Sequence, residues 1–382
     1  MENKQKGINF TCHAFIWCMN ISFIISMSQL YDYEVFHYVV IFLDVIAVLF
    51  LFYHYALAKG LQIKTAIFTA VAVVVGLVSY YYSHGPTILK LILFILAVQA
   101  VKEKKTLKFF YRSLILGFLI VLLTSFGGIT ASTYYSQFKQ AYSFGFQNPN
   151  TVPVILFAIM GGINIVYEDS LKVKHIILEF LATLSFYYFF KGRTALIICC
   201  LTFVLLLIDK PLKDTKFLKV IAWPFQFLFL ILATFSYYVT IVYHSSNSQW
   251  KQINMLLSGR LYAWHGYYTR YGISVFGNRL STEYYGALDN AYLQLLIKYG
   301  IVAFILYAVI FFILSRYAWK NNRWVLLTMI IASELYFLGE FGPMIVNFCP
   351  VILCFGCMLN NSEQIIDEET ATIVTWHGKK LF

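Results

Sequence analysis

Long apolar segments follow one another along most of this chain, with short polar stretches between them. A helix that crosses a membrane needs about 20 mostly apolar residues. The segments that approach this length are 8–28, 35–58, 65–82, 87–100, 113–130, 151–167, 175–190, 194–208, 217–243, 291–315, 324–340 and 344–360. The fourth, seventh and eighth are the shortest. The pattern therefore predicts an all-α polytopic membrane protein with about twelve spanning helices.

Two connecting segments are longer than a tight turn, 131–150 and 244–290. In the second, Ser258 is placed to cap a short helix that Gly272 ends. Helical spacing then puts four side chains on one face, which we expect to lie at the membrane interface: Arg260, Trp264, Tyr267 and Tyr271. The prediction is one helical domain over 1–360 that includes both loops, followed by a polar tail, 361–382.

The composition agrees with a membrane protein, because 60% of the 382 residues are hydrophobic, 12% are charged and the mean hydropathy is +0.70. The first apolar segment lacks the small-residue cleavage site of a signal peptide, so it is predicted to be the first span. All seven cysteines lie in or beside apolar segments. The Cys354-x-x-Cys357 pair is therefore interpreted as buried packing, not as a redox or zinc site.

The distribution of basic residues predicts how the chain is oriented. Lysine and arginine in short loops stay in the cytoplasm, and most of the 29 basic residues fall in alternate connections when both termini are inside. This predicts a bacterial plasma-membrane protein with cytoplasmic termini. It also accounts for the net charge of +11 without a nucleic-acid partner.

The arginines depart from this distribution. Four of the seven, but only three of the 22 lysines, fall in connections that the alternation assigns to the outside; the arginines are Arg193, Arg260, Arg270 and Arg279. A guanidinium presents a rigid fork that matches phosphate and carboxylate oxygens. The bias indicates anion recognition on the outer face, although an aromatic belt with arginines on lipid phosphates would produce a similar pattern.

Three short motifs supply candidate site residues. Lys191 and Arg193 stand in FFKGRTALI, a short turn between two spans, where they would bind a pyrophosphate or simply snorkel to the interface. Asp289 opens the tenth predicted helix, as a helix cap, a general base or both. Asn148-Pro149-Asn150 is typical of a turn and cap before the sixth helix.

Acidic residues offer other sites. Asp32-Tyr33-Glu34 in the first outer turn is an acid-x-acid pair of a kind that binds Mg²⁺ or Mn²⁺, and acidic residues are also simply tolerated in such a turn. Four charged residues fall within spans or at their ends, where they are either functional or paired by neighbouring helices: Asp44, Glu179, Lys298 and Glu334.

Taken together, N-P-N before a helix, K-G-R-T in a short turn, G-R-x-x-x-W in a long loop and D-N-A-Y-L-x-x-L-x-x-x-G at a helix entry resemble the O-antigen and capsular polysaccharide polymerase and ligase family, the Wzy-like proteins. The resemblance implies an all-helical, GT-C-like membrane glycosyltransferase. Its substrate would be an oligosaccharide repeat unit on undecaprenyl pyrophosphate. Membrane lipids, a chain-length regulator and a flippase are further candidate partners.

The resemblance carries catalytic roles to Arg193, Arg260 and Asp289, the last paired with Asn290. Many ligases of the family have histidine where this chain has Asp289, so His265 is the alternative base. We assign substrate binding to Lys191, Trp264, Asn148, Asn150, Asn290 and Arg270. No metal and no other cofactor are expected.

This chemistry needs cations for a doubly charged leaving group and a base for the acceptor hydroxyl. Because the carrier lipid would supply the energy, no nucleotide-binding loop is required, and no such motif occurs in the sequence. The expectation is a polymerase that moves a growing glycan onto the next lipid-linked repeat unit outside the plasma membrane. A ligase, or a flippase or transporter of lipid-linked oligosaccharide, is the alternative. The excess of lysine over arginine is typical of AT-rich bacterial genomes and suggests a bacterium without an outer membrane. This would disfavour lipopolysaccharide and indicate a capsule or exopolysaccharide as the product.

Overall fold

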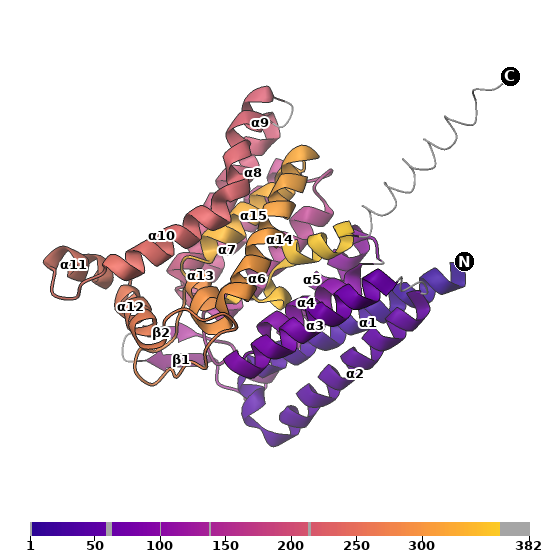
Figure 1. The fold of residues 1–382 in the computed structure, drawn as a ribbon, viewed down its shortest axis with the longest axis horizontal. Coiled ribbons are helices and arrows are strands. Elements are labelled where there is room, and N and C mark those ends of the chain that lie inside the picture. The colour runs from indigo at the N-terminus through magenta and orange to yellow at the C-terminus, as the bar shows by residue number, and fades with distance from the viewer. Residues whose placement is uncertain (1, 59–62, 100, 137–138, 213–214, 360–382) are drawn as a thin grey trace.

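The computed structural model describes residues 2–58, 63–99, 101–136, 139–212 and 215–359. The predicted tail, 361–382, lies outside these residues. The described chain is mainly helical (Figure 1). Its first half contains α1 (Glu2–Ser26), α2 (Glu34–Ala58), α3 (Ile63–Ser83), α4 (Thr87–Val98), α5 (Glu103–Phe126), α6 (Thr151–Val166) and α7 (Val173–Phe190).

The second half contains more interruptions. It consists of α8 (Arg193–Leu212), α9 (Lys216–Ala222), α10 (Leu228–Val242), α11 (Ser248–Leu256), α12 (Arg260–Tyr271), α13 (Ala291–Leu293), α14 (Gly300–Lys320) and α15 (Trp324–Tyr336). A last helix covers Pro350–Leu359. Every predicted apolar segment contains one of the described helices.

In the part of the chain that the structure describes, six helices are long and apolar enough to cross a membrane: Lys4–Ser26, Glu34–Leu57, Glu103–Phe126, Val173–Phe190, Leu218–Val242 and Ala291–Lys320. Five shorter apolar helices accompany them, at Thr69–Ser83, Thr87–Val98, Thr151–Val166, Trp324–Tyr336 and Pro350–Leu359. This agrees with a polytopic helical membrane protein. The finer prediction of twelve complete spans in a GT-C-like arrangement stays a prediction.

Several helix bounds differ from those predicted by hydropathy. Helix α5 begins at Glu103, ahead of the apolar run, because a carboxylate in the first turn favours the helix and the basic residues that follow continue it. The ninth predicted span is interrupted by a 3-10 segment, η2 (Trp223–Phe227), which contains Pro224. The tenth contains a π-helical segment, η3 (Gln294–Tyr299), between α13 and α14.

The first long loop contains a β-hairpin, so the prediction of an all-α chain is wrong at this point. Strand β1 (Thr133–Ser136) pairs antiparallel with β2 (Lys139–Tyr142), with Thr133 opposite Tyr142. The strands read TYYS and KQAY, and threonine and tyrosine favour extended backbone. The hairpin packs against α7, where the ring centroids of Tyr142 in β2 and Phe189 in α7 lie 5.9 Å apart; its strands are labelled in Figure 1.

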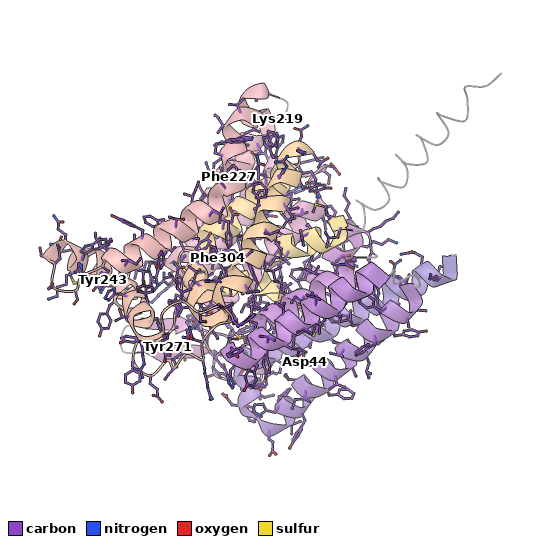
Figure 2. All side chains as sticks on the ribbon, viewed as in Figure 1. Asp44, Lys219, Phe227, Tyr243, Tyr271 and Phe304 are labelled. Atoms are coloured by element: carbon purple, nitrogen blue, oxygen red, sulfur yellow. The ribbon has the colours of Figure 1, made fainter. Side chains whose placement is uncertain are left out.

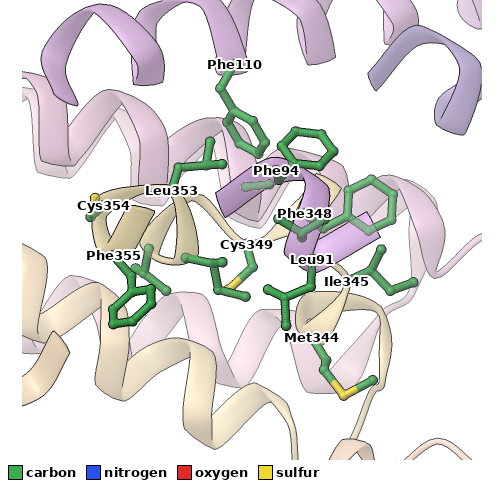
Figure 3. Close-up of a cluster of buried hydrophobic side chains, with 14 of the residues drawn as sticks. Leu91, Phe94, Phe110, Met344, Ile345, Phe348, Cys349, Leu353, Cys354 and Phe355 are labelled. Carbon is green, nitrogen blue, oxygen red and sulfur yellow. The ribbon is translucent and has the colours of Figure 1, made fainter. Parts of the chain in front are cut away.

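The core surrounds the irregular segment that precedes the last helix. Figure 3 shows Leu91 and Phe94 of α4 and Phe110 of α5 gathered around residues 344–355, where Phe348 and Cys349 are buried. The buried Asn347 side chain donates to the Met19 carbonyl at 3.3 Å and to Asn20 Oδ1 at 2.9 Å. The Tyr307 hydroxyl of α14 donates to the Met344 carbonyl at 2.9 Å, and a bond of this kind makes non-helical backbone tolerable inside a membrane protein.

Connections predicted to share a side of the membrane lie together in the structure. At one end, Tyr33 Oη donates to the Ile129 carbonyl at 2.8 Å. At the other, Trp319 Nε1 donates to the Lys219 carbonyl at 2.8 Å. Figure 2 places Lys219 near α9, away from Tyr243 and Tyr271. We call the end where Tyr33 contacts Ile129 the loop end. It comprises the described residues of 28–34, 127–150, 190–193, 243–290 and 337–343. Which end faces the cytoplasm stays a prediction.

Candidate functional site

The loop end contains a cavity of about 610 Å³, which we call the cationic cavity. Asn150 lines it from the start of α6, and Arg260 from the start of α12. Lys191 and Arg193 line it from the turn between α7 and α8. The structure thus brings together four of the predicted site residues. Glu340, beyond the end of α15, also lines the cavity and was not among the predicted residues.

Arg260 is the most highly connected of these residues. Its Nε lies 3.3 Å from Asp289 Oδ2, and its Nη2 lies 3.0 Å from Glu340 Oε1. Its Nη1 donates to Thr194 Oγ1 at 3.4 Å. The guanidinium therefore holds three segments together, the start of α8, the end of the long loop and the segment after α15.

The prediction that Ser258 caps α12 is wrong. The cap is Gly259, which adopts the left-handed conformation with φ 83° and donates its N–H to the Asn254 carbonyl at 2.8 Å. This bond closes the end of α11, and three residues, Leu257, Ser258 and Gly259, separate it from α12. The Ser258 hydroxyl instead accepts from Arg193 Nη2 at 3.1 Å. The predicted end of α12 at Gly272 is confirmed.

The turn between α7 and α8 is as short as predicted, because α7 ends at Phe190 and α8 begins at Arg193. Lys191 has a left-handed backbone with φ 51°, and the Gly192 carbonyl accepts the first helical bond, from Leu196 N at 3.1 Å. Two cationic side chains thus stand at the start of α8, where the helix dipole is positive. Helix α6 also begins at the cavity, and Asn150 makes no side-chain cap bond to it. The local field favours an anion.

Glu340 links two of the cavity residues. Its Oε1 accepts from Asn150 Nδ2 at 3.3 Å and from Arg260 Nη2 at 3.0 Å, and its side chain is only 13% exposed. The sequence carried one signal for it, an acidic residue at the end of an apolar run. We named Glu334, six residues earlier, among the charged residues of the spans and did not select Glu340.

Asp289 is not the cap of α13, contrary to one of its two predicted roles. The cap is Asn290, whose Oδ1 accepts from Leu293 N at 3.0 Å. The Asn290 amide is fully buried and donates to Ser236 Oγ at 3.0 Å and to the Leu338 carbonyl at 3.2 Å. Asn290 therefore positions its neighbour and does not reach the cavity. Burial raises the pKa of Asp289, and the Arg260 charge acts in the opposite direction.

The remaining predicted residues are directed elsewhere. Trp264 is 6% exposed and packs with Tyr267 and Leu288 in a small second core. The aromatic face of α12 is thus buried in protein, because the loop 273–290 returns over it; the location of this helix at the membrane interface stays a prediction. His265 Nδ1 donates to the Thr240 carbonyl of α10 at 2.9 Å.

Arg270 and Asn148 also act locally. The Arg270 guanidinium lies over the Tyr284 ring, 4.0 Å from its centroid, and Asn148 Oδ1 accepts from Asn150 N at 2.8 Å in a turn. Among the described residues that line the cavity, none is Trp264, His265, Arg270, Asn148 or Asn290.

The acidic pair in the first turn is divided between separate partners. Asp32 Oδ1 accepts from Gln147 Nε2 at 3.4 Å, and Glu34 Oε1 accepts from the Tyr38 hydroxyl at 3.2 Å. Within the described ranges, no group of three or more histidine, cysteine, aspartate or glutamate side chains is arranged to hold a metal ion.

The charged residues within spans differ from one another. Asp44 accepts from Ser22 Oγ at 2.6 Å and lies 3.9 Å from Lys90 Nζ, while Glu179 accepts from Asn164 Nδ2 at 2.9 Å. Their charges are therefore met by neighbouring helices. Lys298 Nζ lies 5.3 Å from the Tyr299 ring centroid. Glu334 is fully buried, and among the described residues neither of its carboxylate oxygens has a hydrogen-bond partner.

Cys354 and Cys357 are both buried free thiols. Cys357 Sγ lies 3.6 Å from the Val98 carbonyl and Cys354 Sγ lies 3.7 Å from the Pro350 carbonyl, so the two thiols are directed to different neighbours. The interpretation of this pair as buried packing is confirmed.

Comparison with protein-family models, curated proteins and solved structures finds no match for this chain. The resemblance noted above therefore rests on the four motifs. Three of them contribute residues to the cationic cavity, and the fourth contributes Asp289, which contacts Arg260.

Proposed function

We propose that this protein is a membrane glycosyltransferase that moves a growing glycan from undecaprenyl pyrophosphate onto a lipid-linked oligosaccharide repeat unit. The observation that carries the proposal is the cationic cavity at the loop end. There, Lys191, Arg193 and Arg260 come together at the starts of α6 and α8.

The charges of this cavity suit a pyrophosphate diester. Three cations and the carboxylate of Glu340 are among the described residues that line it, and Asp289 pairs with Arg260 from outside this lining. One net positive charge therefore remains to attract a doubly charged anion. Guanidinium groups make paired hydrogen bonds to phosphate oxygens. Positive groups fixed in advance around a developing charge lower the barrier to its formation, which is the main task in expelling a lipid pyrophosphate.

Two carboxylates are placed to act as the base. In the proposed step the acceptor hydroxyl oxygen bonds to C1 of the donor sugar while its proton passes to a carboxylate. The bond from C1 to the pyrophosphate oxygen breaks, and the lipid pyrophosphate leaves with the electron pair. Asp289 is the base that the motif assigns, and Glu340 is the carboxylate that lines the cavity. Both contact Arg260, so the base and the leaving-group site share one residue.

The location of the site follows from the charge pattern. With both termini in the cytoplasm, as the lysine distribution predicts, the loop end faces the outside of a bacterial plasma membrane. There the donor and the acceptor are both lipid-linked, and no nucleotide is available as an energy source. Capsule or exopolysaccharide assembly is the corresponding process, with a flippase and a chain-length regulator as partners.

A ligase that hands the glycan to another acceptor would use the same cavity. A flippase is favoured by a different observation, because two of the long apolar helices are interrupted, by η2 and by η3. Interrupted helices are typical of transport sites near the middle of a membrane. The cations that line the cavity, however, lie at the loop end and not within the spans, which favours the transferase.

The test is to express the wild type, Arg193→Ala, Arg260→Ala, Asp289→Asn and Glu340→Gln in a strain that lacks the gene, with equal membrane levels confirmed. Arg270→Ala is the matched control, since Arg270 belongs to the same loop and stacks on Tyr284 outside the cavity. The proposal predicts that single lipid-linked repeat units accumulate on the outer face of the site variants but not of the control. Units retained on the inner face would identify a flippase, and full-length unattached polymer would identify a ligase.

A further inference from the structure

A second cavity, of about 120 Å³, adjoins the cationic cavity. Pro153, Gly192 and Ala195 line both, so the two are adjacent. Three helices form its walls, each through residues spaced i, i+3, i+4 and i+7 along one face. We call it the apolar slot.

We propose that the apolar slot holds the first isoprenoid segment of the carrier lipid whose pyrophosphate lies in the cationic cavity. The inference rests on the proposed function. It adds the path by which the lipid chain leaves the pyrophosphate headgroup. An amphiphile requires an anion site and an apolar channel that meet, and here they meet at the turn between α7 and α8.

The walls have the chemistry of a hydrocarbon site. Leu156, Phe157 and Met160 face the slot from α6, and Phe186 faces it from α7. Methionine and aromatic side chains adapt well to irregular apolar ligands. The volume is similar to that of engineered apolar cavities of about 150 Å³, which accept benzene. The slot thus has room for a short branched hydrocarbon segment.

The polar side chains of the slot are bonded to the protein. Glu179 accepts from Asn164 Nδ2 at 2.9 Å, and the Thr183 hydroxyl donates to the Glu179 carbonyl at 2.9 Å. The Thr183 hydroxyl also lies 3.8 Å from Met160 Sδ. These bonds reduce the tendency of the polar groups to bind water in the slot, so apolar surface is what the slot offers a ligand.

Helix α7 connects the slot with the surroundings of the protein. It is one of the helices apolar and long enough to cross a membrane, and only 18% of its residues are buried inside the protein. Leu181 and Tyr188 are exposed on it, at 52% and 78%. A chain that starts in the slot can therefore continue along α7 into the hydrocarbon of the bilayer.

The test compares the binding of three probes, inorganic pyrophosphate, farnesyl pyrophosphate and farnesol, to the purified full-length chain in nanodiscs. Ala182→Trp fills the slot from α7. Leu181→Trp is the matched control, because it places the same side chain on the same helix but outside the slot. Ala182→Leu is a smaller filling change for use if Ala182→Trp does not fold.

In the wild type and in Leu181→Trp, we expect farnesyl pyrophosphate to bind at least about tenfold more tightly than inorganic pyrophosphate, since burial of a few methylene groups produces such a ratio. In Ala182→Trp the ratio should fall below about threefold, with the affinity for inorganic pyrophosphate unchanged.

Equal affinities of the wild type for the two pyrophosphates, or equal ratios in the two tryptophan variants, would overturn the slot and leave the proposed function intact. If inorganic pyrophosphate does not bind and farnesol binds in a way that Ala182→Trp abolishes, the slot stands and the anion site of the proposed function fails. If no probe binds the wild type, both fail.

Discussion

The guanidinium of Arg260 lies 3.0 Å from the carboxylate of Glu340, although 80 residues separate the two in the chain. Both side chains are largely buried, with 23% and 13% of their surfaces exposed. Arg260 also lies 3.3 Å from Asp289. The arginine is therefore held between two carboxylates, and it is oriented before any substrate arrives.

Arg260→Lys should reduce transfer activity by about 10²-fold or more, because an ammonium group cannot make the three directed contacts of the guanidinium.

Glu340→Gln keeps the shape of the side chain and removes its charge. Its activity should fall by about 10²-fold or more if Glu340 is the base, and by a smaller factor, through a misplaced Arg260, if Glu340 only orients the guanidinium. The measurement is the rate of glycan extension on a purified lipid-linked repeat unit, with Arg270→Lys as the control.

The pH dependence of activity should report Asp289. Burial raises the pKa of this carboxyl, and Arg260 lowers it by a smaller amount, so the net direction is upward from the ordinary value of 3.8. A base acts in its deprotonated form. Activity should therefore fall with decreasing pH through an apparent pKa above 3.8. This acidic limb should be absent from the residual activity of Asp289→Asn, and a limb that persists there would assign the base to another group.

The pH dependence of folding stability should also report the Asp289 carboxyl, and its sign can be predicted. Because the folded protein holds the Asp289 proton more tightly than the unfolded chain, the contribution of this carboxyl is greatest below its unfolded pKa and is lost as pH rises through its folded pKa. Asp169 is the contrast, since its hydrogen bond from Lys104 lowers its pKa. Its contribution is lost as pH falls, and is small because the pair is exposed. Thermal unfolding of Asp289→Asn and Asp169→Asn against pH measures both slopes.

Gly277→Ala should destabilise the long loop strongly. Gly277 has φ 107°, and an added Cβ would collide with the carbonyl oxygen of Lys298 in the π-helical segment η3. The neighbouring Asn278 N–H donates to that same carbonyl at 2.9 Å, so this contact attaches the loop to η3. We expect a loss of more than about 2 kcal/mol, from backbone strain together with the lost bond.

Gly286→Ala is the control for this change. Gly286 also has a positive φ, 70°, but an added Cβ would meet no atom within 4 Å. Only the conformational cost of about 1 kcal/mol should remain. Equal losses of thermal stability in the two variants would show that the contact between the loop and η3 contributes nothing.

Arg323→Leu should destabilise the end of the molecule opposite the cavity. Arg323 Nη2 lies 2.7 Å from Glu103 and 2.8 Å from Glu168, and all three side chains are mostly buried. Its removal leaves two carboxylates unpaired, at a cost of about 3 kcal/mol. Arg316→Leu, an exposed arginine at the same end, is the control. The loss of folding stability in Arg323→Leu should become smaller as pH falls. Burial raises the pKa of Glu168, and once this carboxyl is protonated it no longer needs a cation as partner.

The positions of the helices could be predicted from the sequence, since an apolar run in a membrane must satisfy its backbone hydrogen bonds within itself and therefore becomes a helix. The turn at Lys191 to Arg193 and the helix end at Gly272 were likewise local features. The interruptions η2 and η3 and the hairpin β1–β2 were missed, because hydropathy does not register which backbone groups find partners outside their own helix.

The composition of the cavity was decided by the tertiary structure. Four of its residues had been selected by residue type and by the motifs, yet Glu340 was missed, and Trp264 and His265 were assigned to it although they face α10 and the small second core. Helical spacing gives the face of α12 on which a side chain lies, but not what packs against that face. Asn150, Arg193, Arg260 and Glu340 lie at or beyond the ends of four different helices, α6, α8, α12 and α15, so only the packing of those helices could bring them to one place.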